Sequence, residues 1–130
     1  MPSIFTRIIQ GEIPCHRLLE DDRYLAFLDV RPISPGHALV IPKVEIDRLF
    51  DLDDALLGDL MVFAKRVALA IEAVVPCERV GLMVAGLEVP HAHVHLVPIR
   101  SIGDLSFANA TPAEPADLAT LAESIRQQLA

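Results

Sequence analysis

Residues 89–98 read VPHAHVHLVP, and this short run constrains the fold more than any other part of the sequence. Three histidines stand at every second position, and the residues between them are apolar. Because the side chains of a β-strand alternate between two faces, a strand here places His91, His93 and His95 on one face. The opposite face then carries Ala92, Val94, Leu96 and Pro98. The pattern therefore predicts a strand with one buried apolar face and one chemical face.

The rest of the sequence predicts an α+β fold. Between residues 51 and 75, apolar side chains recur every three or four positions, which indicates one long helix. Four further strands are predicted at HRLLED, YLAFLDV, HALVIP and RVGLMVAG, between residues 16 and 86. Short helices are expected near residues 5–9 and after the sequence TPAE, with Thr111 as the cap of the second. We expect a single domain over residues 1–130, with its core in 3–98 and a C-terminal tail and helix in 99–130.

Composition narrows the range of partners. The chain has 130 residues, two cysteines and a formal net charge of −7. An acidic chain without clustered Lys and Arg is not expected to bind a nucleic acid polymer or an anionic membrane. Cys15 and Cys77 are far apart and have no CxxC spacing, which is typical of a reducing compartment. No run reaches the roughly 18 apolar residues of a membrane span, so we expect a cytoplasmic protein.

Three chemical interpretations of the histidine run are open. In a strand, the backbones of His91 and His95 lie about 13 Å apart, too far for three rings to share one metal ion. Two of the rings can still bind a metal if His37 or Glu88 supplies a third ligand. A second interpretation is purely structural, although three histidines in register would each need a buried hydrogen-bond partner. In the third, the rings surround an anion: one neutral imidazole attacks phosphorus and a ring N–H stabilises the charge.

The run HAHVHLV, residues 91–97, resembles the signature of the histidine triad (HIT) family, His-φ-His-φ-His-φ-φ with φ apolar. SIFTRIIQGEIP and EDDRYLAFLDVRPISPGHALVIPK extend the resemblance over residues 3–98. It implies a five-stranded antiparallel sheet with one long helix and short terminal helices, paired into a homodimer. It also implies a hydrolase that acts at the α-phosphate of purine nucleoside phosphoramidates or related adenylylated compounds. A dinucleoside polyphosphate hydrolase, or a nucleotide-binding module with weak turnover, is the alternative.

The resemblance assigns roles to individual residues. His93 matches the nucleophile that forms a nucleotidyl-histidine, His95 would bind the α-phosphate, and His91 would orient the row. His37 matches a histidine that supports these three, and Asp29 is expected on the ribose hydroxyls. An apolar slot for the base is expected from Phe5, Ile8, Phe27, Val30 and Leu39. From the sequence alone, the apolar residues could equally be plain core, and Asp29 could cap the turn that follows it.

Several positions depart from the family pattern. Leu87 stands where glutamine is common, and Glu88 stands where phosphoramidase relatives often have serine or threonine near the leaving group. A carboxylic acid there can protonate a leaving amine, whereas a carboxylate repels an anionic leaving group. Zinc-binding relatives have two cysteines and a histidine at the positions of Ser3, Thr6 and Glu45. We therefore expect no structural zinc, and since the sequence has no phosphate-binding P-loop, no other cofactor is expected.

Overall fold

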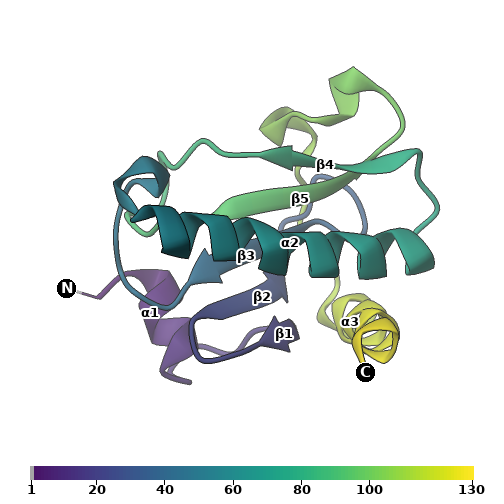
Figure 1. Ribbon diagram of the computed structural model, residues 1–130. Helices are drawn as coiled ribbons and strands as arrows, with labels where there is room; N and C mark the ends of the chain where they lie inside the picture. Colours follow the sequence, from purple (N-terminus) through teal and green to yellow (C-terminus); the bar gives the residue numbers. More distant parts are fainter. Residues whose placement is uncertain (1) are drawn as a thin grey trace.

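The computed structural model describes residues 2–130 and contains a five-stranded antiparallel sheet (Figure 1). The strands are β1 (Arg17–Glu20), β2 (Tyr24–Leu28), β3 (Ala38–Pro42), β4 (Arg79–Met83) and β5 (Val94–Ile99). Their order across the sheet is β1-β2-β3-β5-β4, and each neighbouring pair is antiparallel. The predicted α+β fold with its five-stranded antiparallel sheet is confirmed.

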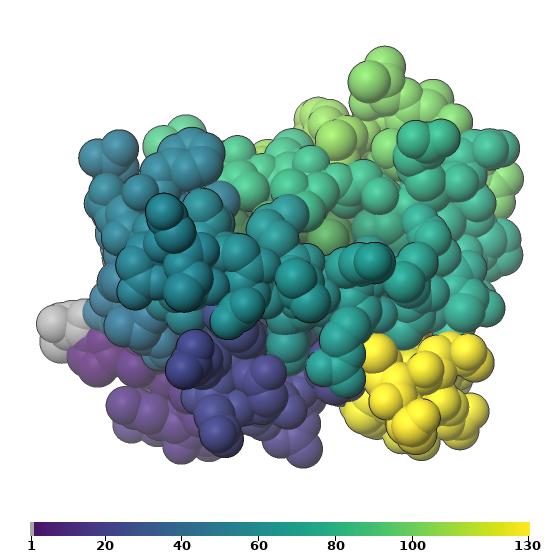
Figure 2. Space-filling model, viewed as in Figure 1, coloured from purple at the N-terminus to yellow at the C-terminus, as the bar shows by residue number. Residues whose placement is uncertain are grey.

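Helix α2 (Asp54–Val74) is the predicted long helix, and it lies across one face of the sheet (Figure 1). It begins after Asp53, whose side chain accepts a hydrogen bond from the Leu56 amide at the start of the helix. Pro76 follows its end and cannot continue the helical hydrogen bonds. The side chains of α2 cover the middle of the molecule in Figure 2. Neither α2 nor any other helix within residues 2–130 is long and apolar enough to cross a membrane.

Helix α3 (Pro115–Leu129) begins later than the sequence indicates. The predicted cap at Thr111 is wrong, because the helix starts after Glu114 and no side chain caps its first turn. The amides of Thr111 and Ala113 instead donate hydrogen bonds to carbonyl groups of the loop after β2. These bonds hold the segment against that loop, so it cannot form the first helical turn. The helix then packs against α2 and β1.

The face of the sheet away from α2 carries a second, smaller apolar cluster. Leu25, Phe27, Leu39 and Ile41 alternate along β2 and β3 with residues of the main core. Helix α1 (Ile4–Ile9) covers this cluster with Phe5. His95 stands opposite Leu39 in the register of β3 and β5, so its side chain shares this face.

Strand β5 is shorter than predicted. It begins at Val94 rather than at residue 89, so only His95 of the three histidines lies within a strand. The physical reason is that the Ala92 amide donates its hydrogen bond to the Ile46 carbonyl in a loop, outside the strand pairing. The alternation of faces persists, because Ala92 and Val94 both lie in the main core. The predicted apolar side of this segment is therefore correct.

Candidate active site

His93 directs one ring nitrogen at the backbone, which fixes the position of its proton. The Nδ1 atom lies 2.7 Å from the carbonyl oxygen of His91, and His93 is buried. A carbonyl oxygen can only accept a hydrogen bond, so Nδ1 carries the proton of the neutral ring. The lone pair is then on Nε2. This is the state that an imidazole needs in order to attack an electrophile.

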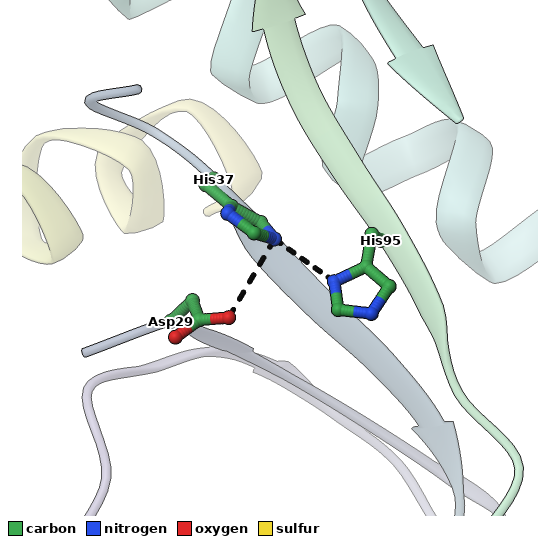
Figure 3. A group of neighbouring side chains, drawn as sticks. All are labelled: Asp29, His37 and His95. Atoms are coloured by element: carbon green, nitrogen blue, oxygen red, sulfur yellow. Dashed lines mark hydrogen bonds and ion pairs between the residues drawn. The ribbon is translucent and has the colours of Figure 1, made fainter. Parts of the chain in front are cut away.

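A second pair of rings, His37 and His95, is oriented by a backbone amide. The Ile33 amide donates to Nδ1 of His37 at 2.9 Å, so the proton of that ring is on Nε2. This Nε2–H group in turn donates to Nδ1 of His95 at 2.9 Å, with Asp29 Oδ2 at 3.6 Å from the same nitrogen (Figure 3). The proton of His95 is therefore on its own Nε2. His95 thus offers an N–H donor on the side of its ring away from His37.

Burial lowers the pKa values of three of the histidines. Burial, together with the neighbouring rings of His37 and His93, lowers the pKa of His95 to about 3. Burial also lowers the pKa of His37, against the charge of Asp29, and that of His91. The cause is that removing a ring from water disfavours its charged form. These three rings are therefore neutral at pH 7, in agreement with the proton positions set by their hydrogen bonds.

His91 turns away from the other two histidines of the run. Its Nε2–H group donates to the Pro42 carbonyl at 2.8 Å, and its Nδ1 atom accepts from the Ser3 hydroxyl at 2.8 Å. The residue is 0% exposed. Both ring nitrogens are thus occupied, and His91 cannot reach a ligand. Its side chain supports the site, while its carbonyl group orients His93.

A small cavity of about 110 Å³ adjoins the rings of His93 and His95. The rest of its wall comes from the segment before the histidine run and from the C-terminal tail. These residues are Ala85, Gly86, Leu87, Glu88 and Phe107. A cavity of about 270 Å³ also has His93 in its wall, but not His95. Two larger cavities, of about 590 and 410 Å³, have no histidine in their walls and lie away from this chemistry. The site therefore combines a ring with a lone pair, a ring with an N–H donor, and a carboxyl group around one small space.

Comparison with known proteins identifies the family of this chain. The sequence model described as HIT domain matches residues 10–102. This chain belongs to the HIT family. It is 34% identical over 140 residues to the adenosine 5′-monophosphoramidase hnt1 of Schizosaccharomyces pombe, covering 99% of each chain.

Solved structures of HIT proteins share the fold. A HIT-like protein from Bartonella henselae is 30% identical and superposes with a TM-score of 0.85, covering 97% of this chain and 95% of the other. A Zn-bound histidine triad family protein from Mycobacterium smegmatis is 29% identical, with a TM-score of 0.83, covering 97% and 91%. The predicted family and fold are thus confirmed.

The HIT-type apolar slot predicted from the sequence is only partly assembled. Phe5, Phe27 and Leu39 lie together in the second apolar cluster, and Ile8 packs against its edge. The Phe5 ring also meets the His93 ring edge-on, with 5.1 Å between their centroids. Val30 stands apart and is 62% exposed. Four of the five predicted slot residues therefore lie together near the histidines, and the fifth, Val30, is exposed at the surface.

Asp29 caps the turn, as one of the two interpretations made from the sequence predicts, and also faces His37. Its Oδ1 atom accepts a hydrogen bond from the Arg31 amide at 2.9 Å, which caps the turn after β2. Its Oδ2 atom faces His37 Nε2 instead. One carboxylate thus stabilises the turn and lies beside the oriented pair of rings.

Sequence reasoning missed Phe107. Its ring lies edge-on to His95, with 5.0 Å between the centroids, and it also lines the small cavity. It belongs to the short 3-10 helix Phe107–Asn109, in the part of the C-terminal tail before the predicted helix. An isolated phenylalanine in a loop forms no periodic pattern, so the one available signal was its being a large apolar residue outside any predicted helix or strand.

The donor set of this HIT chain does not favour a metal. Within residues 2–130, one group of His, Cys, Asp and Glu side chains has ligand atoms close enough to share an ion: Asp29, His37 and His95, within 4.8 Å of one another (Figure 3). The His37 atom that would bind is Nε2, and it carries a proton because Nδ1 accepts from the Ile33 amide. A protonated ring nitrogen has no lone pair for a metal. A pair of rings that includes His91 cannot bind a metal either, because both nitrogens of His91 are engaged.

Proposed function

We propose that this HIT protein hydrolyses purine nucleoside phosphoramidates, or related adenylylated compounds, through a nucleotidyl-histidine on His93. The observation that carries the proposal is the pair of fixed tautomers at one cavity. His93 presents a lone pair on Nε2, and His95 presents an Nε2–H donor. A nucleophile beside a fixed hydrogen-bond donor is what attack on a phosphoryl group requires. The similarity to a named adenosine 5′-monophosphoramidase supports the substrate class.

The reaction proceeds in two displacements. In the first, the Nε2 lone pair of His93 forms a bond to the α-phosphorus while the phosphorus–nitrogen bond breaks, and the leaving amine takes up a proton. Glu88 lines the cavity, and we assign this proton transfer to its carboxyl group. In the second, water attacks the phosphorus and the bond to His93 breaks, which restores the Nε2 lone pair. The nucleoside monophosphate leaves, and the Glu88 carboxylate takes up the proton of the water, which restores its carboxyl group for the next turnover.

The other predicted residues have supporting roles in this proposal. The Nε2–H group of His95 donates to a non-bridging oxygen of the α-phosphate, where negative charge develops. His37 and His91 hold the reacting rings in their tautomers. Asp29 binds the ribose hydroxyls, at a position whose side chain is still one-fifth exposed. We assign the base to the apolar slot predicted at Phe5, Ile8, Phe27, Val30 and Leu39, of which Val30 is an exposed position outside the buried cluster.

Glu88 favours phosphoramidates over the alternative substrate, a dinucleoside polyphosphate. A leaving amine needs a proton, which the carboxyl group of Glu88 can supply, whereas the leaving group of a polyphosphate is an anion that departs without one. The net charge of −7 supports a small-molecule substrate rather than a nucleic acid polymer or a membrane. We also infer one domain over residues 1–130 and a cytoplasmic location.

The test is to incubate the protein with adenosine 5′-phosphoramidate and measure the release of AMP. His93→Ala is expected to abolish release, and rapid acid quenching of the wild type should reveal an adenylyl group on His93 by peptide mass spectrometry. Equal release by wild type and His93→Ala would refute the proposal. Tight binding of AMP without release or adduct would instead assign the chain to the nucleotide-binding modules.

We further propose that two copies pair through β4 and α2. Strand β4 is the last in the sheet order, and a strand edge offers backbone N–H and C=O groups for pairing. Exposed apolar side chains accompany this edge, including Leu82 on β4 and Val62 and Leu69 on α2. A twofold pair of such edges would cover them. Light scattering should find a dimer that Leu82→Arg converts to monomer; a monomeric wild type contradicts the pairing.

A further inference from the structure

Ser3, Thr6 and Glu45 form a hydrogen-bonded cluster at the start of α1. Glu45 Oε1 accepts hydrogen bonds from the Ser3 amide and from the Thr6 hydroxyl, both at 2.6 Å. The Ser3 hydroxyl accepts from the Thr6 amide at 3.0 Å and donates to Nδ1 of His91 at 2.8 Å. Ser3 is 5% exposed, so its bond to His91 is shielded from water. One carboxylate thus organises two hydroxyl residues that lie about forty positions away in the sequence.

The cluster continues into the candidate active site. The Ser3 hydroxyl and the Pro42 carbonyl hold the two nitrogens of His91 from opposite sides. The carbonyl group of the same residue accepts the hydrogen bond from His93 Nδ1. Phe5, which lies between Ser3 and Thr6 in the sequence, packs edge-on against both rings, with centroids 5.8 Å from His91 and 5.1 Å from His93. A shift of this cluster therefore moves both the bond and the packing that orient His93.

The cluster occupies the positions where zinc-binding relatives have two cysteines and a histidine, and its chemistry does not fit zinc. Structural zinc is held in tetrahedral geometry by thiolates, imidazoles and carboxylates. Of the four side chains here, only Glu45 and His91 belong to those classes, and the Nδ1 lone pair of His91 is engaged by the Ser3 hydroxyl. Two hydroxyl groups complete the set, and their protons are committed to hydrogen bonds. The arrangement is complete without an ion.

We propose that Glu45, Thr6 and Ser3 form a metal-free strut that holds His91 and thereby positions His93 for attack. The effect of the strut on catalysis rests on the proposed function, but the chain of hydrogen bonds from Glu45 through Ser3 and His91 to His93 does not. These three are positioning residues, since none of them reaches the small cavity beside His93. What the strut supplies is a fixed acceptor at residue 45 and a fixed donor at residue 3.

Kinetics separate positioning from substrate binding. Glu45→Ala removes the acceptor and Ser3→Ala removes the donor, so each is expected to lower kcat for the phosphoramidate about 10- to 100-fold through misplacement of His93, with KM changing less than about twofold. Glu45→Gln keeps an oxygen acceptor and should retain wild-type kcat. Glu12→Ala is the matched control, because it removes a carboxylate whose exposed ion pair with Arg7 lies at the other end of α1.

A spectroscopic measurement tests the same link without turnover. The Nδ1 proton of His93 is protected by its bond to His91, so its exchange with water can be followed by NMR. Faster exchange is expected in Glu45→Ala and Ser3→Ala, and unchanged exchange in Glu45→Gln and Glu12→Ala. If the wild type shows no hydrolysis, the proposed function fails, while this exchange rate still decides the strut. Circular dichroism shows whether each variant is folded. If one of Glu45→Ala and Ser3→Ala is unfolded, the other is used to test the strut.

Three results would overturn the strut. The first is wild-type kcat and wild-type proton exchange in both folded alanine variants. The second is a Glu45→Gln variant that is as impaired as Glu45→Ala. The third is a wild-type protein that binds one equivalent of added zinc and gains thermal stability from it, with both effects lost in Glu45→Ala. Wild-type melting that is unaffected by zinc and by a chelator is the expected result.

Discussion

The Nε2 atom of His37 lies 2.9 Å from Nδ1 of His95, and the direction of the hydrogen bond between them is set by the Ile33 amide (Figure 3). Because that amide donates to His37 Nδ1, the proton between the two rings belongs to His37. His95 must then carry its own proton on Nε2. A backbone N–H group thus determines which face of His95 is a donor.

His37→Ala is expected to lower kcat because it removes the donor to His95 Nδ1. The buried nitrogen is then unpaired, and His95 can move its proton from Nε2 to Nδ1, which removes the donor proposed for the phosphate. Loss of a donor to a developing oxyanion costs roughly 100- to 1000-fold in kcat. His16→Ala is the control, because His16 takes no part in this group. AMP release gives the rates, and imidazole ¹⁵N shifts of His95 report the tautomer; an unchanged tautomer in the variant contradicts the assignment.

Stability should fall as the pH drops below about 6.5, the ordinary pKa of histidine. The pKa of His95 falls from 6.5 to about 3 on folding, and those of His37 and His91 are lowered in the same direction. As the pH falls below 6.5, the unfolded chain therefore binds protons that the folded chain does not. The free energy of unfolding is highest above pH 6.5 and decreases as the pH falls toward the folded pKa of about 3.

Each such group contributes a slope of up to about 1.4 kcal/mol per pH unit within that window. Urea unfolding at about pH 7.5, 6.5 and 5.5 measures it, above the range in which most carboxylates titrate. His95→Gln removes one of the three groups and should flatten the dependence. A wild-type urea midpoint that does not change over this pH range would show that the histidine rings titrate alike in the folded and unfolded states.

Glu88→Gln tests the choice of leaving group. The amide cannot donate an acidic proton to a departing amine, so kcat for a phosphoramidate is expected to fall about 100-fold or more. A dinucleoside polyphosphate has an anionic leaving group that needs no proton to depart, so its cleavage should be unchanged. The ratio of the two rates, measured on the same preparation, is the decisive quantity. An equal loss on both substrates would exclude Glu88 as the proton donor.

The parts of the fold that follow a single period were predictable from the sequence. The helical repeat of α2 and the two-residue repeat before β5 each bury one apolar face against the main core. The start of α3 was not predictable, because the amides at Thr111 and Ala113 bind a loop that is distant in sequence. Tertiary hydrogen bonds of this kind override a local capping pattern.

The candidate site was likewise predictable from the sequence only in part. Alternation along the histidine run predicted that His93 and His95 share one face, and both rings line the small cavity. The proton positions depend on the Ile33 amide and on carbonyl groups, which have no sequence signal. From the sequence, Ser3 and Glu45 were recognised only as residues that differ from the zinc ligands of relatives. The hydrogen bond between them joins the segment before α1 to the loop after β3, and no sequence pattern predicts that contact.

Phe107→Ala is expected to raise the pKa of His95. The Phe107 ring lies edge-on to His95 and closes one side of the small cavity, and burial is the largest cause of the low pKa of that histidine. Removing the phenyl group admits water to the imidazole and stabilises its charged form. An NMR titration of His95 should then show a midpoint above about 3, nearer the ordinary histidine value. Phe50→Ala, at an exposed aromatic position outside this wall, should leave the midpoint unchanged. Identical titration of wild type and Phe107→Ala would mean that other groups keep water from His95.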